Sequence, residues 1–164
     1  MRFTLVQTVA PSAAPVELSE ARNYLRLTER DHDAVLQLLL DTAIGRVESF
    51  LIRALVNRTY TMLLREMPSG TALALPMPPL VSVSQVASYN EAHAATVFAS
   101  SNYRVDTASL IGRIVLNEGA TWPTGVRADQ PLEVTFVAGY GSDGASVPAA
   151  IRHGLLMTVA TWFE

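Results

Sequence analysis

Hydrophobic residues recur at helical spacing over the first third of this chain. From Glu17 to about Leu27, apolar side chains at positions 18, 21 and 25 predict a short amphipathic helix. A longer helix follows, with Asp31 and Asp33 as plausible caps. Gly45 lowers the stability of that helix by about 1 kcal/mol relative to Ala, so we expect close helix packing there. The apolar stripe of the long helix comprises Val35, Leu39, Ala43, Val47, Phe50 and Ala54, widened by Leu36, Leu40, Ile44 and Leu51.

After Asn57 the spacing changes from helical to alternating. Several segments are rich in Val, Thr, Tyr and Leu and are separated by clusters of Pro, Gly, Asn or Ser. Proline lacks the amide donor that a strand ladder needs, and glycine opens positive φ, so these clusters predict turns. The pattern predicts an antiparallel β region with strands at Arg58–Glu66, Ala72–Leu75, Ser82–Tyr89, Tyr103–Asp106, Arg113–Asn117 and Leu132–Ala138.

A final helix is predicted after Pro148, which fits the first helical turn. Its apolar face comprises Ile151, Leu155, Val159 and Trp162, with Leu156 and Phe163 beside it. The fold class is therefore α+β: an N-terminal helical pair, a central antiparallel β region and a C-terminal helix. We expect one domain, 1–164, in which 1–15 form an extended arm or loose lead-in, 16–56 are helical, 58–140 form the β region and 147–164 the last helix.

Composition narrows the possible functions. Charged residues make up only 16% against a typical 25% or so, which indicates that partners cover part of the surface. A net charge of -3 argues against binding nucleic acid through a basic face. All twelve cationic side chains are arginine and there is no Cys, which excludes lysine nucleophiles, disulfides, thiolate catalysis and Cys-ligated zinc.

The sequence predicts neither a membrane-spanning segment nor a secretion signal. No apolar run reaches the ~18 residues of a membrane span, so we expect no membrane association. The start of the chain is similar to a signal peptide, but Gln7 and Thr8 interrupt its apolar core. We therefore expect a protein that is not secreted.

A glycine-rich segment follows the last predicted strand. Gly139 to Gly144 match the pattern G-x-G-x-x-G of dinucleotide-binding proteins, which requires a βαβ unit with an acidic residue about 20 positions on. Only twenty residues remain after Gly144, and they predict one helix and no returning strand. We interpret Gly139, Tyr140, Gly141, Gly144 and Pro148 as a wide, flexible structural turn. The alternative is a small-ligand-binding enzyme that uses this loop and a carboxylate.

No other motif predicts catalysis or metal binding. His32, His93 and His153 lie far apart and have no partner at a recognised metal-ligand spacing, and no G-x-S-x-G sequence is present. We therefore expect no catalytic residue, no metal and no cofactor, and a chain that is not an enzyme. Trp122, next to Pro123, is expected to close a loop over the sheet.

A set of short segments in one order resembles the head-tail connector (adaptor) family of long-tailed phages, prophages and gene transfer agents. The Ala-Gly-Tyr-Gly turn before a helix that begins with Val-Pro is the most specific of them. Two features depart from the family: Glu17 stands where relatives often have Thr, and members usually extend beyond the position of Glu164. The segments are Val16–Arg26, Asp33–Leu55, Pro78–Leu80 before Ser82-Val83, Tyr103–Asp106, Gly112–Val115, Trp122-Pro123, Val134–Gly141, Val147–Arg152 and Trp162–Glu164.

This resemblance implies a structural protein of the virion neck, at the head-tail interface, assembled in the host cytoplasm. It implies a ring of about twelve copies beneath the portal protein, with a stopper or head-completion protein on its other side. DNA would pass through the lumen without specific binding, since acidic subunits release no counterions from phosphate. A stopper or tail-terminator ring protein is the alternative within virion proteins.

The resemblance also suggests where partners bind. An apolar helix face near a terminus suits docking into a groove, and Arg152 could form a forked ion pair with an acidic portal residue. The candidate interface residues for the portal or a neighbouring copy are Ile151, Arg152, Leu155, Leu156, Val159, Trp162 and Phe163. An alternative stays open, in which the same stripe packs on Val47 and Phe50 within one subunit.

Overall fold

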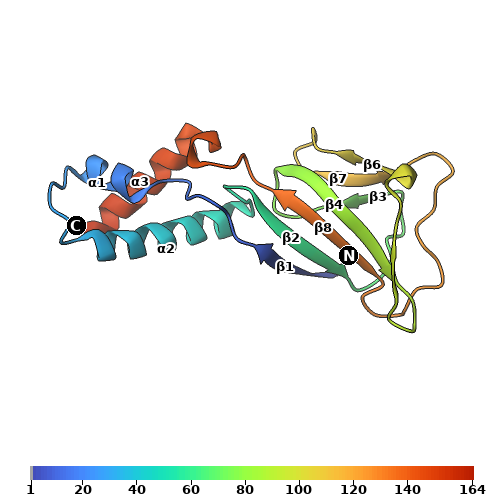
Figure 1. Ribbon diagram of the computed structural model, residues 1–164. Helices are drawn as coiled ribbons and strands as arrows, with labels where there is room; N and C mark the ends of the chain where they lie inside the picture. Colours follow the sequence, from blue (N-terminus) through green and yellow to red (C-terminus); the bar gives the residue numbers. More distant parts are fainter. Residues whose placement is uncertain (1) are drawn as a thin grey trace. The chain divides into compact units, whose positions relative to one another are not determined.

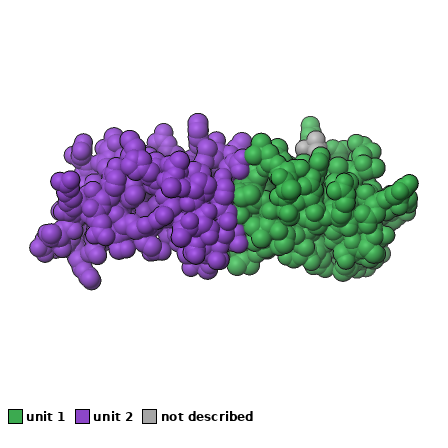
Figure 2. All heavy atoms as spheres, turned by 90° about the horizontal axis from the view of Figure 1, so that it is seen from above, with its two compact units in different colours: residues 1–10, 58–139 green, residues 11–57, 140–164 purple. Residues whose placement is uncertain are grey.

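The computed structural model describes residues 2–164 and shows a mixed α+β fold with three α-helices and two antiparallel sheets (Figure 1). The chain divides into two compact units (Figure 2). The sheet unit contains the residues up to Ala10 and Arg58–Gly139, and the helical unit contains Pro11–Asn57 and Tyr140–Glu164. The α+β class predicted from the sequence is confirmed, and the chain passes between the units after Ala10, Asn57 and Gly139.

The sheet unit contains every strand of the described chain. A five-stranded sheet has the order β1-β2-β8-β4-β5 and a three-stranded sheet the order β3-β7-β6. The strands are β1 (Phe3–Val9), β2 (Arg58–Leu64), β3 (Ala72–Ala74), β4 (Leu80–Tyr89), β5 (Ala95–Val97), β6 (Tyr103–Asp106), β7 (Arg113–Leu116) and β8 (Leu132–Ala138). Each strand pair is antiparallel, as predicted.

Alternation of side chains explains why the central strands form where they do. In β2 and β8 every second residue is buried, so that Met62 lies opposite Val134 and Tyr60 opposite Phe136 on one face. Phe136 is fully buried, and its ring stacks on that of Tyr60 with centroids 5.7 Å apart. Burial of such a face is the main source of stability of the sheet unit.

Two strands lie outside the segments predicted from the sequence. Within 1–15, the segment predicted as an extended arm or loose lead-in, Phe3–Val9 forms the extended strand β1, which pairs with β2. Ala95–Val97 forms β5 and pairs with β4. Both strands lie at a sheet edge and are largely exposed, which removes the alternation of buried and exposed side chains that identifies a strand.

The helical unit consists of α1 (Leu18–Leu25), α2 (Asp33–Leu51) and α3 (Ala149–Phe163), with the 3-10 turn η2 (Gly144–Ser146) before α3. All three α-helices were predicted, and Pro148 stands immediately before α3. A second 3-10 turn, η1 (Ser100–Asn102), precedes β6 in the sheet unit. The core of the helical unit comprises Val16, Ala21, Leu36, Leu40, Ala43, Leu55, Val56, Val147, Leu155 and Val159.

Three details of α2 differ from the sequence prediction. His32, rather than Asp31 or Asp33, occupies the N-cap position. Val35 and Phe50 are exposed instead of lying in the buried stripe, because the face that contacts α1 and α3 is centred on Leu36, Leu40 and Ala43. A Cβ at Gly45 would meet no atom within 4 Å, so the expected close helix packing there is wrong.

Within residues 2–164, no helix combines the length and the apolar character needed to span a membrane.

Candidate protein-binding surfaces

The apolar face of α3, the predicted docking element, lies mostly within the helical unit. Leu155 and Val159 are buried in its core. Four half-buried residues pack against the same core and still expose part of their surface: Ile151, Leu156, Trp162 and Phe163. Leu155 and Val159 therefore stabilise the unit itself, so contacts of α3 with another chain would fall to the half-buried residues.

Arg152, the cation predicted to reach a partner, contacts an acid of its own chain. Its guanidinium forms an ion pair with the Oε1 of Glu20 in α1, 132 positions earlier in the sequence. The other carboxylate oxygen of Glu20 accepts a hydrogen bond from the Glu17 backbone N–H at 2.9 Å. Glu20 thus joins the start of α1 to α3. Its bond to the Glu17 N–H also caps the start of α1, where Glu17 stands in the place of the Thr common among relatives.

A groove on the helical unit offers an apolar surface to another molecule. It has a volume of about 360 Å³ and lies between α2 and α3, and we call it the α2–α3 groove. Phe50, on α2, has 84% of its surface exposed at this groove. The guanidinium carbon of Arg46 lies 5.8 Å from the centroid of the Trp162 ring, which is a cation–π contact. The lining residues are Ala43, Arg46, Val47, Phe50, Thr158 and Trp162.

The glycine-rich segment forms a packed turn between β8 and α3. A Cβ on Gly144 would lie 2.7 Å from the Ala14 carbonyl oxygen, and one on Gly141 would lie 2.2 Å from the Ser146 Oγ. Asp143 accepts hydrogen bonds from the Ser146 N–H at 2.9 Å and from its hydroxyl at 2.8 Å, which hold the pKa of its carboxyl below its usual range.

In the structure this segment leads from β8 through η2 into α3, and no βαβ unit follows it within residues 2–164. Gly139, with φ of 146°, adopts a backbone conformation open to glycine, and Gly141 and Gly144 are needed for close packing.

The three histidines lie apart, and each contacts an aromatic ring or an arginine. The His32 ring packs edge-on against Phe163 and the His153 ring against Tyr24. The His93 Nδ1 lies 3.1 Å from the Arg127 guanidinium. In the part of the chain that the structure describes, no three His, Asp or Glu side chains form a group that could hold a metal ion.

Trp122 closes a loop of the sheet unit. Its indole N–H donates to the Gly70 carbonyl oxygen at 2.7 Å, and its ring lies 5.9 Å from that of Phe98. Both contacts lie inside the unit, in agreement with the prediction that Trp122 fixes a loop.

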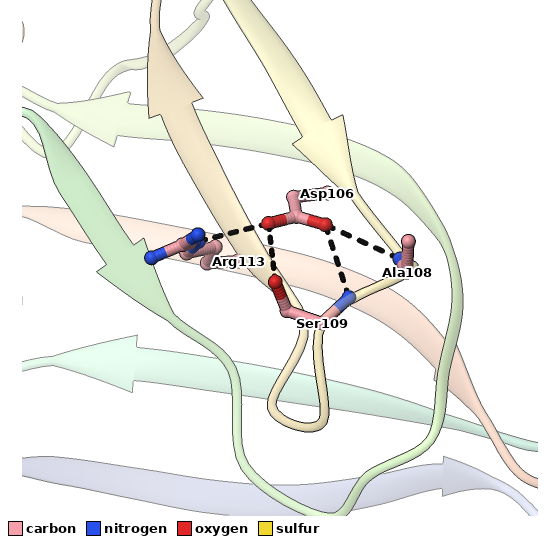
Figure 3. Close-up of polar contacts among 4 residues, drawn as sticks. All are labelled: Asp106, Ala108, Ser109 and Arg113. Carbon is pink, nitrogen blue, oxygen red and sulfur yellow. Dashed lines mark hydrogen bonds and ion pairs between the residues drawn. The ribbon is translucent and has the colours of Figure 1, made fainter.

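A surface that the sequence analysis did not identify lies at the tip of the β6–β7 hairpin (Figure 3). The Oδ1 of Asp106 accepts hydrogen bonds from the N–H groups of Ala108, at 3.2 Å, and Ser109, at 3.1 Å. Its Oδ2 accepts from the Ser109 hydroxyl at 2.7 Å and from the Arg113 Nε at 2.9 Å. These bonds fix a turn at whose tip Leu110 and Ile111 are exposed, Leu110 by 75%. An Asp followed by Ser three positions on, the pattern of a side-chain-capped turn, is the signal that could have identified it.

The order of this hairpin tip depends on the ionisation of Asp106. Hydrogen bonds from the Ser109 hydroxyl and from Arg113 lower the pKa of the Asp106 carboxyl to about 2, against about 3.9 in an unfolded chain. Because the folded-state pKa is depressed, the stabilisation is complete above about pH 4 and is lost as the pH falls towards 2. We expect the amide NMR signals of Leu110 and Ile111 to shift over this range.

Two substitutions test this assignment. Asp106→Asn should give, already at neutral pH, the signals that the original chain shows in acid. Asp129→Asn, at an exposed position of the same unit, should titrate like the original chain. Unchanged signals of Leu110 and Ile111 in Asp106→Asn would show that the carboxylate does not order the tip.

Comparison with known proteins gives matches of fold. No protein-family model matches the chain, and no curated protein sequence matches it significantly. Solved structures match over almost its whole length, among them three from gene transfer agent (GTA) particles. One is the neck of an empty GTA particle computed with C6 symmetry, with a TM-score of 0.84, 24% identity, and coverage of 98% of this chain and 83% of that chain.

The other two structures come from native particles. The virion of a native gene transfer agent (GTA) particle gives a TM-score of 0.84 at 23% identity and covers 98% of this chain and 84% of that chain. The neck of a native GTA particle computed with C12 symmetry gives a TM-score of 0.79 at 25% identity and covers 99% of this chain and 83% of that chain. The chain therefore has the fold of a protein present in these particles.

Proposed function

We propose that this chain is a structural protein of the neck of a phage or gene-transfer-agent particle, where copies of it form a ring. The observation that carries the proposal is the match of fold over 98% of the chain to the neck of a GTA particle, with a TM-score of 0.84. Low charge and exposed apolar side chains on both units support it, since a ring subunit buries such surface against its neighbours.

Within the neck, we propose the role of head-tail connector, or adaptor, docked on the portal protein and followed by a stopper. The ordered set of segments that resembles this family supports the finer assignment, above all Val134–Gly141 followed by Val147–Arg152. In the structure the first segment ends β8 and begins the packed turn, and the second segment ends that turn and begins α3. A stopper or tail-terminator ring is the other candidate, supported by the large share of β structure in the sheet unit.

Contacts with the portal protein are proposed on the helical unit. The half-buried residues of α3 and the α2–α3 groove together expose Phe50 and Trp162 beside Arg46. Such a surface fits an apolar side chain of a partner with a carboxylate next to it. DNA would pass through the ring without specific binding, because a chain of net charge -3 offers little counterion release.

No catalytic role is part of this proposal. The loop that could have held a small ligand is filled by its own packing, with Gly144 against the carbonyl oxygens of Ala14 and Pro15. Asp143, the carboxylate within that loop, is engaged by Ser146. The proposed function therefore needs no cofactor and no reacting group.

Removing the chain from a producing strain tests the proposal. Electron microscopy should show heads and tails that are present but not joined, and the original gene supplied in trans should restore joined particles. To separate adaptor from stopper, chemical cross-linking of heads without tails should join this chain directly to the portal protein. Normal tailed particles in the strain that lacks the chain would overturn the neck proposal, and cross-links only to another neck protein would favour the stopper.

A further inference from the structure

The five-stranded sheet has two edges, β1 and β5, and within residues 2–164 no further strand pairs with either. Neither strand contains a charged residue or a proline: β1 reads FTLVQTV and β5 reads ATV. Sheet edges of soluble proteins are normally protected by such residues, because open N–H and C=O groups invite pairing with another chain. Both edges of this sheet are therefore suited to strand pairing.

Hydrogen bonds at the ends of β1 and β5 show which backbone groups face outward. The Arg65 N–H donates to the Arg2 carbonyl oxygen. Every second residue of an antiparallel strand directs its backbone groups at the partner strand, so the N–H and C=O groups of Thr4 and Val6 also bond to β2. The N–H and C=O groups of Phe3, Leu5 and Gln7 then point to the open edge.

The same argument applies at the other edge of the sheet. The Phe98 N–H donates to the Val86 carbonyl oxygen and the Asn90 N–H to that of Ala94, so Thr96 bonds to β4. The backbone groups of Ala95 and Val97 point outward. Each edge thus offers donors and acceptors to a strand beside it.

The two edge strands run in the same direction. Four successive antiparallel pairings separate β1 from β5, so the two strands are parallel to each other. In a twelvefold ring, the symmetry computed for one neck of the same fold, each copy is turned by only about 30° from the last. If one sheet continues into the next, β5 of one copy therefore meets β1 of its neighbour as a parallel pair.

The faces of the sheet allow this parallel pair. One row of paired residues runs across the sheet through Phe3, Leu64, Leu132, Ser88 and Thr96. Phe3 and Thr96 therefore lie on the same face as the buried Leu64 and Leu132. Leu5, two positions after Phe3, also lies on that face. Opposite residues of paired strands share a face, and in a parallel pair only one of the two directs its backbone groups at the partner. Leu5 opposite Thr96 meets both conditions, whereas an antiparallel pair would place residues of different faces opposite each other.

Side chains favour this register. With Leu5 opposite Thr96, Val6 lies opposite Val97 on the outer face, and these two valines are 45% and 61% exposed in the single chain. The parallel direction also brings Arg2, just before β1, to the same end as Glu91, which precedes β5. The exposed valines therefore match across the junction.

We propose that neighbouring copies of this chain join edge to edge, with β5 of one copy and β1 of the next in a parallel pair. The junction is heterologous, since two different edges meet, and a heterologous contact closes into a ring when the rotation between copies divides a full turn. This inference rests on the proposed function, because its direction and its face follow from a cyclic assembly.

Cysteine cross-linking tests the register, and a chain without natural Cys makes the experiment clean. Particles assembled with the double variant Val6→Cys/Val97→Cys are oxidised and run on a non-reducing gel. We expect a ladder of multiples of this chain, since each copy bonds to both neighbours. Either single variant should give dimers at most, and the exposed but out-of-register pair Val9→Cys/Val97→Cys should give no ladder.

A proline substitution tests the hydrogen bonds. Leu5→Pro removes an outward N–H without removing a bond to β2, so the variant should fold but not assemble. Leu5→Ala loses the same side chain, keeps the N–H and should enter particles like the original chain. Equal melting temperatures of the two purified variants would show that loss of assembly is not loss of folding.

The outcomes separate this inference from the proposed function. If the chain is present in necks but the Val6–Val97 pair gives no more ladder than the Val9–Val97 pair, edge-to-edge pairing is wrong and the neck function stands. The same conclusion follows if Leu5→Pro assembles as well as Leu5→Ala. If the original chain is absent from particles, the proposed function fails and this inference fails with it.

Discussion

Replacing Leu155 by Ala should lower the free energy of unfolding by about 3 kcal/mol, because it leaves a cavity among fully buried side chains. Leu155 lies in the core of the helical unit together with Leu36, Leu40 and Val159. Met157→Ala, on the same helix at a position that is 53% exposed, should change the same free energy by no more than about 0.5 kcal/mol. Urea denaturation followed by far-ultraviolet circular dichroism measures both variants.

This pair of variants also decides what α3 does in the isolated chain. A large loss in Leu155→Ala shows that the helix is held by its own unit before any partner binds. Equal stability of the two variants would contradict the packing of α3 described above. Leu155 would then again be a candidate residue for binding another protein.

Replacing Phe136 by Ala should lower the free energy of unfolding of the sheet unit by about 4 kcal/mol, more than Leu155→Ala lowers that of the helical unit. The Phe136 side chain is fully buried on β8, the central strand of the five-stranded sheet, and stacks on Tyr60 of β2. Val81→Ala, at an exposed position of the neighbouring strand β4, serves as the control and should be nearly neutral. The measurement is the midpoint and slope of unfolding in guanidinium chloride.

A result near that of the control would mean that the face shared by β2 and β8 is not the core of the sheet unit. In that case the alternation of buried positions along Leu132–Ala138 would have another cause. A change in slope as well as midpoint would instead indicate that the compactness of the unfolded or native state has changed or that unfolding is no longer two-state.

Much of the fold could be predicted from the sequence wherever burial imposes a period. Arg58–Leu64 and Leu132–Ala138 alternate strictly because one face is fully buried, and both strands form within the predicted segments. The three helices follow from repeats of three and four residues. β1 and β5 were missed since an edge strand exposes both faces and leaves no such period.

The candidate surfaces were harder to predict. A helical repeat identifies an apolar face but not what covers it, so the sequence could not distinguish Leu155, which is buried, from Phe50, which is exposed. The partner of Arg152 was also hidden, because Glu20 lies 132 positions away and only folding brings the two together. The hairpin tip at Leu110 depends on local bonds of Asp106, which hydrophobic patterns do not record.

The way the chain alternates between its two units has a consequence for its synthesis. Thr61 of β2 lies beside Thr135 of β8, 74 positions later, and α1 is joined to α3 across 132 positions. The contacts between β2 and β8 and between α1 and α3 can therefore form only after β8 and α3 have left the ribosome, and contacts of such long range fold slowly. During that interval the uncharged strands β1 and β5 are exposed in an incompletely folded chain. We expect the yield of native protein to depend on chaperones and on growth temperature more strongly than the stability of the finished fold would suggest.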